Sequence, residues 1–369
     1  MQNISETVLE IDLNALGNNY RYLRSKLNPD TKILGVVKAF GYGSSAVAVA
    51  KELANLGADY LAVAYASEGI ILRDGGVNMP ILVLHSLPHN FESIVHRCLE
   101  PNIYSKKILL EFIDYAEEHA LENYPIHLKF NTGLNRLGFS EEDIPYILEA
   151  LSKTKSVTVK SALSHLAASE DHAERAFTLQ QIDAFKRISK ALIAGLGYHP
   201  ILHTVNTSGI LNYPEAHLNM VRTGIGLYGF GNDPVQNKFL QPILTLKTII
   251  SQIHEIAAGE TIGYNRAYTT PSPVRTATLP IGHADGISRA LGNGVGWVTI
   301  FGKKAPIIGN VCMDMIMVDV SEISCNEGDE VLIFGNDPTA ETLSEAINSI
   351  PYELLTALSQ RIKRVVCRK

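Results

Sequence analysis

The sequence predicts an α/β protein that combines an N-terminal (β/α)8 barrel of the TIM type with a C-terminal all-β domain. At 369 residues the chain is long for one ordinary compact domain. Its N-terminal part alternates short apolar runs with amphipathic stretches, and from about residue 241 strand-like runs dominate. We therefore place the barrel in residues 1–240 and the β domain in residues 241–369.

Eight apolar runs predict the barrel strands. They lie at residues 33–37, 60–64, 81–85, 102–104, 126–130, 159–163, 201–205 and 219–222. Segments with apolar residues three and four positions apart lie between most of them, including 13–26, 44–56, 106–119, 141–152 and 172–194. A strand followed by a crossover segment pairs in parallel with the next strand, and eight such units close a barrel.

The C-terminal part has a different pattern. Strand-like runs lie at 243–253, 261–267, 276–280, 295–301, 305–308, 316–320 and 330–334, and a helical period appears at 342–358. Residues 8–12 are also strand-like, so we expect residues 1–12 to pair with this domain. The basic stretch 361–369 is interpreted as a solvated tail.

Composition excludes several classes of protein. A formal net charge of −6 without a basic run argues against a nucleic-acid binder. No apolar run reaches the roughly 18–20 residues that span a bilayer, and the polar N-terminus is no signal peptide, so we expect a cytoplasmic protein. The four cysteines lack metal-type spacing, which predicts reduced thiols and no metal site.

The first chemical feature is Lys38, which closes the first buried strand and precedes a glycine-containing turn. Barrel enzymes carry their reactive groups at the C-terminal ends of the strands. A lysine amine in apolar surroundings has a lowered pKa and can form a Schiff base with an aldehyde cofactor. The alternative is a lysine that simply extends from a strand end into water.

Further cationic or titratable residues lie at or near the ends of other predicted strands. Lys129 lies near the end of the fifth run and Arg136 follows it, His165 follows the sixth, His203 lies in the seventh and Arg222 ends the eighth. One histidine in such a place is more often structural than catalytic. Together these residues predict a rim that binds an anion, either a phosphate or a carboxylate.

The loops after the seventh and eighth strands are the usual phosphate site of a barrel. Residues 207–209 and 223–226 offer hydroxyl groups, backbone amides and glycines that allow close approach. A Gly-Ile-Gly turn also occurs in loops that bind nothing.

Several longer motifs resemble the alanine racemase family. They are VVKAFGYG, KFNTGLNRLGF, HTVNTS, VRTGIGLYG, TIGYNRAY, PIGHADGISR and GNVCMD. They occur in the order typical of that family and extend over nearly the whole chain. The family has an N-terminal barrel and a C-terminal β domain, as the periodicity independently predicts.

The resemblance implies the cofactor pyridoxal 5'-phosphate, which Lys38 would hold as an internal aldimine. His165 would lie beside the pyridine ring, and Arg222 would face its nitrogen. The remaining cofactor-binding residues would be Tyr42, Asn206, Thr207, Gly224 and Ile225. Because arginine only donates hydrogen bonds, the ring nitrogen should stay unprotonated, and we hypothesise that this favours racemisation over transamination.

The resemblance also implies interconversion of L-alanine and D-alanine by two-base proton transfer on an external aldimine. Lys38 would serve the D-face and Tyr264 the L-face. A tyrosine pKa near ~10 is high for a base, so His203 and Arg222 would tune Tyr264 through hydrogen bonds. Without the resemblance, Tyr264 would be interpreted as a surface or edge-strand aromatic residue.

The family forms head-to-tail homodimers with shared active sites, which implies that Tyr264, Met313 and Asp314 reach the partner's Lys38. Arg136 and the Met313 backbone would bind the substrate carboxylate. Lys129 matches a position that carries a carbamate in some relatives, although an ordinary lysine is our expectation. The implied role is D-alanine supply for peptidoglycan.

Four residues depart from the family pattern: Phe40 stands for Asn, His283 for Tyr, Asn310 for Arg and Gln360 for Tyr. They put in doubt the gating of the entrance and the selection of alanine, but none of them is a proposed base.

Three alternatives are considered, and features of the chain argue against the last two. A broad-specificity or serine racemase would use the same scaffold. A decarboxylase of the same cofactor class would lack the base in the Gly-Tyr-Asn motif. A non-catalytic pyridoxal-phosphate homeostasis protein would stop after the barrel.

Overall fold

The computed structural model describes residues 6–231 and 234–369, which form two compact units. The barrel unit comprises Leu16–Gly41 and Ala46–Gln241. The β unit comprises the described part of Met1–Ala15 together with Tyr42–Ser45 and Pro242–Lys369. Residues 1–5 of the segment 1–12, which we expected to pair with the β domain, lie outside the described residues.

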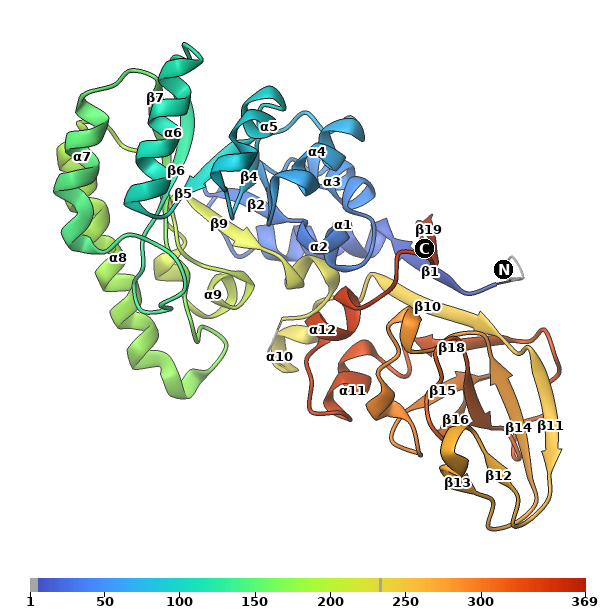
Figure 1. The fold of residues 1–369 in the computed structure, drawn as a ribbon. Coiled ribbons are helices and arrows are strands. Elements are labelled where there is room, and N and C mark those ends of the chain that lie inside the picture. Colours follow the sequence, from blue (N-terminus) through green and yellow to red (C-terminus); the bar gives the residue numbers. More distant parts are fainter. Residues whose placement is uncertain (1–5, 232–233) are drawn as a thin grey trace. The chain divides into compact units, whose positions relative to one another are not determined.

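The predicted parallel barrel is confirmed. Within the described residues an eight-stranded parallel sheet has the order β8-β7-β6-β5-β4-β3-β2-β9 (Figure 1). Its strands are β2 (Lys32–Val36), β3 (Tyr60–Val63), β4 (Ile81–Val83), β5 (Glu100–Ile103), β6 (Tyr124–Lys129), β7 (Val157–Leu163), β8 (Ile201–His203) and β9 (Met220–Thr223). Backbone bonds from Asn219 to Leu202 (3.1 Å) and from Arg222 to Val205 (3.2 Å) link β9 to β8 and complete the ring.

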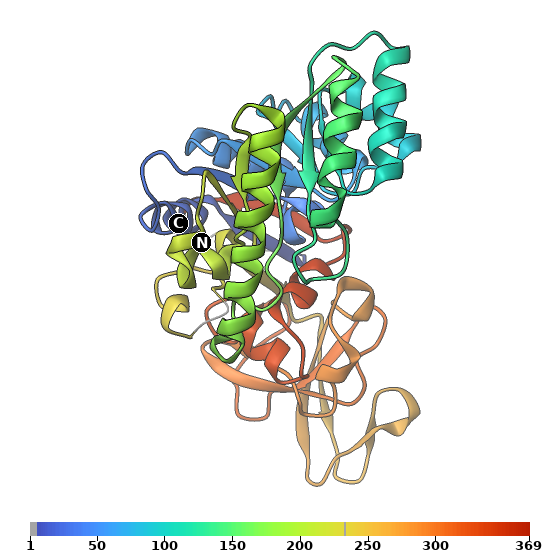
Figure 2. The same ribbon diagram turned by 90° about the vertical axis from the view of Figure 1, so that its left-hand side faces the viewer.

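The crossovers carry helices outside the strands. They are α3 (Ala46–Asn55), α4 (Ala66–Asp74), α5 (Phe91–His96), α6 (Lys106–Glu118), α7 (Ile144–Ser152) and α8 (Arg175–Leu196), and α1 (Leu13–Arg24) precedes the first barrel strand. Helix α8 is the long yellow-green helix of Figure 2. No helix in the described part of the chain is both long enough and apolar enough to cross a bilayer.

The barrel core follows from strands that are buried on both faces. All four residues of β3 are buried, as are the three of β4. Such strands are continuous apolar runs rather than alternating ones, which is why the runs were visible in the sequence. Helices add large buried side chains such as Phe112 and Phe185, each worth about 1.5–3 kcal/mol of burial.

The fourth barrel strand starts earlier than predicted. We expected residues 102–104, whereas β5 spans Glu100–Ile103 and includes Pro101. Proline tolerates the extended backbone, and here Pro101 stands opposite Val83 of β4. The extension brings Glu100 into the barrel sheet.

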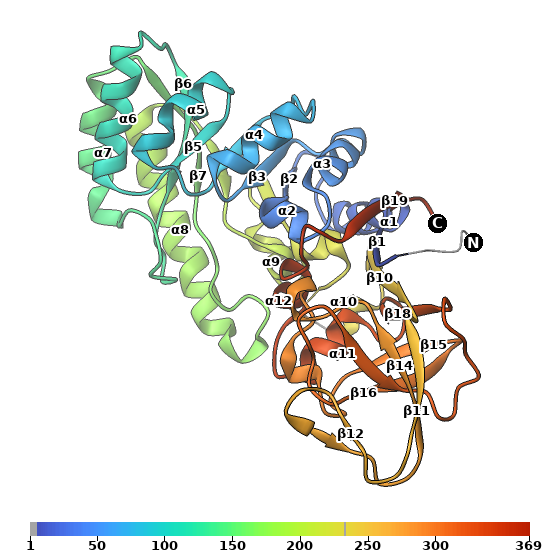
Figure 3. The ribbon, with the colours of Figure 1, turned by 45° about the vertical axis from the view of Figure 1, so that its right-hand side comes forward.

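The β unit is built on a nine-stranded sheet within the described residues, with the order β11-β14-β17-β16-β15-β18-β10-β1-β19 (Figure 3). Its strands are β1 (Val8–Asp12), β10 (Leu244–Ile249), β11 (Gln252–Ile256), β14 (Val274–Leu279), β15 (Trp297–Ile300), β16 (Lys303–Ile308), β17 (Ile316–Asp319), β18 (Glu330–Phe334) and β19 (Lys363–Cys367). A separate ribbon pairs β12 (Thr261–Ile262) with β13 (Tyr268–Thr269). The expected all-β domain is thus confirmed.

Two strand predictions in this unit were wrong. The run 243–253 is two strands, because the amides of Ile250 and Ser251 bond to different neighbours, Asp329 and Thr278. The run 261–267 is extended only at β12. Positive φ angles at Gly263 (77°) and Asn265 (58°) then turn the chain, so that Tyr264 lies in a short 3-10 turn, η6 (Tyr264–Arg266).

The C-terminal predictions also need correction. The expected helix 342–358 is two helices, α11 (Ala340–Glu345) and α12 (Pro351–Thr356), since Pro351 lacks the N–H that would continue a helix and instead starts one. The tail predicted at 361–369 contains β19, which pairs in parallel with β1. Its charged residues concealed the strand, because β19 is an edge strand.

Gly138 is a position where the barrel fold demands glycine. Its φ is 131°, and an added Cβ would lie 2.5 Å from the Asn131 nitrogen. We expect Gly138→Ala to destabilise the protein by about 3 kcal/mol or more. Gly197→Ala is the matched control, because Gly197 also has positive φ but has nothing within 4 Å of an added Cβ.

Thermal unfolding of the full chain measures both changes. The control should lower the midpoint by about 2–4 °C, which reflects backbone strain alone, and Gly138→Ala by at least twice as much. Equal midpoints for the two variants would contradict the close backbone approach at Gly138.

Candidate active site

Lys38 leaves the end of β2 and enters a left-handed turn. Ala39, Phe40 and Gly41 have φ angles of 51°, 55° and 67°. For residues other than glycine this conformation costs roughly 1–2 kcal/mol each, so the surrounding structure must hold it. The turn marks the start of the short element α2 (Lys38–Tyr42).

Glu68 of α4 holds this turn in place. One carboxylate oxygen accepts the Ala39 amide hydrogen (2.5 Å), and the other accepts those of Ala64 (2.7 Å) and Tyr65 (3.2 Å). Glu68 therefore ties the ends of β2 and β3 together beside Lys38. The sequence analysis missed this residue, although a glutamate at the third position of a helix is a capping signal.

The Lys38 amine has a lowered pKa. Burial lowers it most and the positive charge of Arg136 lowers it further, whereas the negative charge of Glu68 raises it. A lysine in this setting has a larger neutral, nucleophilic fraction near neutral pH than an ordinary lysine.

Arg222 on β9 is the most extensively bonded side chain of the rim. It donates to the carbonyl oxygens of Ser164 (2.7 Å), Thr204 (2.9 Å) and His203 (3.2 Å). It also donates to Nδ1 of His203 (2.9 Å) and Nδ1 of His165 (3.0 Å). Burial lowers the pKa of Arg222 to about 10, so the guanidinium stays charged at neutral pH.

The two histidines beside Arg222 are neutral. Burial lowers the pKa of His165 and of His203 well below the usual range, and the charge of Arg222 lowers both further. Because Arg222 only donates, the Nδ1 atom of each ring must accept, and the proton lies on Nε2.

Lys129 and Arg136 flank the loop after β6. Burial lowers the pKa of Lys129 well below its usual range, and the charges of Arg222 and Arg136 add to this effect. The loop is shaped by Asn131, whose side-chain oxygen accepts from the amides of Gly133 (3.1 Å) and Asn135 (3.0 Å). Arg136 is exposed. The barrel strands thus bring the predicted cationic residues to one end of the barrel, which suits an anionic ligand.

The predicted phosphate loops lie next to each other. Asn206 caps α9 (Thr207–Asn212) by accepting from the Gly209 amide (2.9 Å), and the Thr207 hydroxyl pairs with that of Thr223 (3.1 Å). The Gly226 amide bonds to Thr207 Oγ1 (3.2 Å). An added Cβ at Gly226 would lie 2.6 Å from Thr207, so this packing requires glycine. Gly224 and Ile225 start the 3-10 turn η5 (Ile225–Tyr228).

The other predicted site residues belong to the β unit. Tyr42 is buried there, with its ring centroid 6.0 Å from that of Tyr352, and burial raises its pKa. Gly43 packs closely against α12, since an added Cβ would lie 1.9 Å from the Leu355 oxygen.

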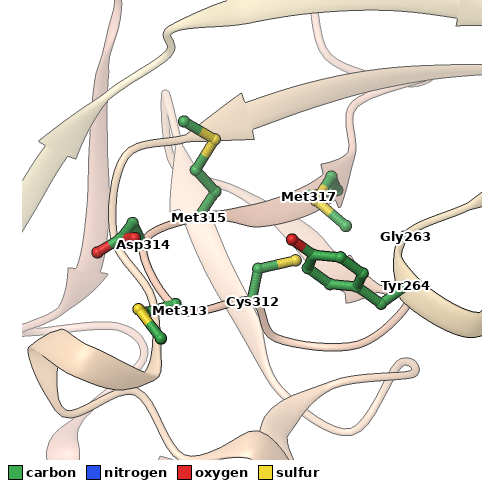
Figure 4. A pocket seen from close by; sticks show the side chains of 7 residues that line it. All are labelled: Gly263, Tyr264, Cys312, Met313, Asp314, Met315 and Met317. Carbon is green, nitrogen blue, oxygen red and sulfur yellow. The ribbon is translucent and has the colours of Figure 1, made fainter.

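Tyr264, Met313 and Asp314 line an open pocket of about 530 Å³ in the β unit. Cys312, Met315, Met317 and Gly263 complete its lining. Figure 4 shows the Tyr264 ring directed from its turn toward Cys312 and Met317. Tyr264 is 74% exposed and Met313 is 59% exposed. Such exposure of two large side chains is typical of an interaction surface.

The loop that carries Met313 is braced by ionic and backbone contacts. Arg361 bonds to Asp314 (2.7 Å) and to the buried Asp285 (2.6 Å). The amides of His283 and Ala284 bond to the carbonyl oxygens of Cys312 and Met313, both at 2.9 Å. Thus Asp314 is held by an arginine, and its pocket keeps a defined shape.

The residues that depart from the family pattern have different surroundings. Asn310 donates to the carbonyl of Tyr264 (3.1 Å) and accepts from Asn293 (3.2 Å), so it supports the Tyr264 turn. His283 lies in the braced segment described above. Phe40 and Gln360 are exposed.

The fold and site define a (β/α)8-barrel protein with a lysine of lowered pKa, a cationic rim and an additional β unit. Family models match over nearly the whole chain: the alanine racemase N-terminal domain over residues 11–232 and its C-terminal domain over residues 243–366. The chain belongs to the alanine racemase family, whose members depend on pyridoxal phosphate.

Individual relatives agree with this assignment. Alanine racemase of Halothermothrix orenii is 36% identical over 97% of this chain and 96% of its own length. Alanine racemase of Clostridium difficile superposes with a TM-score of 0.93 at 33% identity, over 99% of this chain and 97% of that one. Alanine racemase of Bartonella henselae with covalently bound pyridoxal phosphate superposes with a TM-score of 0.89 at 29% identity, over 99% of this chain and 100% of that one.

The charges around Lys38 predict opposite effects of two substitutions. Arg136→Gln removes a positive neighbour and should raise the pKa of Lys38, whereas Glu68→Gln removes a negative neighbour and should lower it. Since only the neutral amine reacts, the pH profile of Lys38 modification should move to higher pH in the first variant and to lower pH in the second.

An amine-selective reagent and peptide mass spectrometry on the cofactor-free protein measure this profile. The exposed Lys153, which pairs with Glu149 on α7, serves as an internal reference. Shifts of the same sign in both variants would contradict the electrostatic account of Lys38.

Proposed function

We propose that this chain is a pyridoxal-phosphate-dependent alanine racemase that interconverts L-alanine and D-alanine. The observation that carries the proposal is Lys38, a lysine of lowered pKa that shares the C-terminal rim of the barrel with Arg222. Membership of the alanine racemase family supports the same substrate.

The residues present fit pyridoxal phosphate. The loops after β8 and β9 bring the Thr207 and Thr223 hydroxyls together where a phosphate could accept from them, and the buried Thr204 hydroxyl has no hydrogen-bond partner in the described residues. We propose that Lys38 binds the aldehyde, that His165 and Arg222 flank the ring, and that the phosphate is bound by Tyr42, Asn206, Thr207, Gly224 and Ile225. When bound, the cofactor withdraws electrons from the substrate and makes its Cα hydrogen acidic.

Arg222 would set the protonation of the ring. Its guanidinium only donates hydrogen bonds, so a ring nitrogen that faces it accepts and stays unprotonated. An unprotonated ring withdraws electrons less strongly than a protonated one. Arg222 would thereby favour racemisation over transamination.

Racemisation requires a proton donor and acceptor on each face of Cα. We propose Lys38 for the D-face and Tyr264 for the L-face. The neutral fraction of Lys38 lets its amine take up a proton. The Tyr264 side chain is largely exposed, so it is available to a substrate bound by another chain. Hydrogen bonds would tune the pKa of this tyrosine. They would come from His165, which carries its proton on Nε2, and from Arg222, which is bonded to His203.

We further propose that the active unit is a head-to-tail homodimer. The partner subunit's copies of Tyr264, Met313 and Asp314 would complete the site at Lys38, because these side chains stand exposed around one pocket of the β unit. Arg136 and the Met313 backbone would bind the substrate carboxylate, and Lys129, a buried neighbour of Arg136 with a lowered pKa, would support Arg136. We place the activity in the cytoplasm, as the supply of D-alanine for peptidoglycan.

The activity test follows the loss of optical activity of L-alanine. Protein with pyridoxal phosphate should convert L-alanine to a racemic mixture, measured by circular dichroism and chiral chromatography. Lys38→Ala should abolish the conversion, and Tyr264→Phe should slow the L-to-D direction by at least about a hundredfold, since a base is lost.

Tyr268→Phe is the matched control for Tyr264→Phe. It removes a hydroxyl from the adjacent strand β13 and should leave the rate within about twofold. A cofactor-loaded protein that leaves alanine unchanged would refute the alanine assignment, and serine and other amino acids would then be screened.

Shared sites predict complementation between two inactive variants. When Lys38→Ala and Tyr264→Phe chains are co-expressed, each mixed dimer should contain one site with both native bases. Random pairing would restore about a quarter of the wild-type sites. Mixed dimers isolated with two different affinity tags should be active, whereas no recovery would show that both bases come from one chain.

A further inference from the structure

A row of polar side chains crosses the barrel sheet beneath the proposed cofactor site. It takes one residue from each of five consecutive strands: Glu100 (β5), His127 (β6), Ser161 (β7), His203 (β8) and Arg222 (β9). The contacts are Glu100 Oε2 to His127 Nε2 (2.6 Å), His127 Nδ1 to Ser161 Oγ (2.5 Å), Ser161 Oγ to His203 Nε2 (2.9 Å) and His203 Nδ1 to Arg222 Nη1 (2.9 Å). Strand register brings His127 directly opposite Ser161.

The row is isolated from water over most of its length. His127, Ser161 and His203 are fully buried, and Arg222 is 5% exposed. Glu100 keeps some contact with solvent at its outer end. Polar groups at such depth destabilise a fold unless each has a hydrogen-bond partner. A continuous row of five such groups therefore indicates a role beyond packing.

The direction of every hydrogen bond follows from Arg222, which only donates. His203 Nδ1 must accept, and the neutral His203 ring therefore carries its proton on Nε2 and donates to Ser161. The Ser161 hydroxyl then donates to His127 Nδ1, and His127 Nε2 donates to the Glu100 carboxylate. Each donor thus meets an acceptor, and the row ends on the Glu100 carboxyl group.

A doubly protonated His127 does not fit this row. Its Nδ1–H would donate to Ser161, which would then accept two hydrogen bonds. Among the described residues the Ser161 hydroxyl contacts only His127 and His203, so its own hydrogen would have no acceptor. His127 is therefore neutral, with its proton on Nε2 facing Glu100.

We propose that Glu100, His127 and Ser161 are positioning residues for Arg222: they fix His203 in the tautomer whose bare Nδ1 accepts from the guanidinium and so hold Arg222 in place. The proposal rests on the proposed function insofar as Arg222 faces the cofactor ring. The Glu100 carboxylate is the anionic end of the row and offsets the cation at its other end. Tyr60 packs its ring edge-on against His127 (centroids 6.0 Å apart, 84°), which restricts rotation of the imidazole.

The direct test is histidine NMR on the cofactor-loaded enzyme labelled with 15N-histidine. Signals of His127 and His203 are assigned by their loss in His127→Gln and His203→Gln. Both rings are expected to be neutral with the proton on Nε2. An imidazolium at His127, or a proton on Nδ1 of His203, would overturn the proposal.

Substitutions along the row separate positioning from packing. Ser161→Ala interrupts the row, and it should change the His203 signal and lower kcat about tenfold with a smaller change in KM, the size expected for one lost hydrogen bond to a charged network. Glu100→Gln keeps an acceptor for His127 Nε2 and should preserve the His127 tautomer. Glu100→Met removes this acceptor, and His127 should no longer be held in that tautomer. Glu149→Gln, an exposed carboxylate-to-amide change on α7, should alter nothing.

The outcomes are distinguishable. Lower thermal stability in Ser161→Ala with unchanged kcat and His203 signal would overturn the proposal and leave the row a packing feature. If Ser161→Ala does not fold, the Glu100→Gln and Glu100→Met pair decides by the His127 tautomer and kcat. An inactive wild-type enzyme with the expected tautomers would refute the proposed function but not the hydrogen-bond order.

Discussion

The burial of the Arg222 guanidinium inside the barrel is the constraint on which the site depends. A cation at this depth is tolerated only when its donors are satisfied. The carbonyl oxygens of Ser164, His203 and Thr204 and the Nδ1 atoms of the two histidine rings accept from its two terminal nitrogens, and the three acceptors at Nη2 share two hydrogens. Meeting this demand fixes both histidines as neutral acceptors and sets the direction of the hydrogen-bonded row behind them.

A second constraint acts at Lys38. The left-handed turn after it is strained for residues that carry a Cβ. Glu68 anchors this turn by accepting the Ala39 amide hydrogen with one oxygen, while its other oxygen holds the amides of Ala64 and Tyr65. The same carboxylate raises the pKa of the amine that burial and Arg136 lower. Glu68 therefore links the stability of the turn to the reactivity of the lysine.

In the β unit the proposed catalytic side chain is exposed, whereas Lys38 and Arg222 in the barrel are largely enclosed. Tyr264 stands on a turn shaped by the positive φ angles of Gly263 and Asn265, and its side chain is largely exposed. Asn310 supports this turn through the Tyr264 carbonyl rather than through the phenol. The hydroxyl group thus remains available to another molecule, in keeping with the proposed shared site.

The sequence by itself determined the barrel and the rim. Strands buried on both faces are continuous apolar runs, and residues at the ends of parallel strands share one end of a barrel, so the sequence alone places Lys38, His165, His203 and Arg222 on one rim. Local strand signals failed where tertiary contacts override them: Pro101 in β5, the charged β19, and the turn at Tyr264. Only the tertiary structure revealed Glu68 beside Lys38 and the row from Glu100 to Arg222. Such partners are distant in sequence, and strand register, which no local pattern encodes, decides which side chains meet.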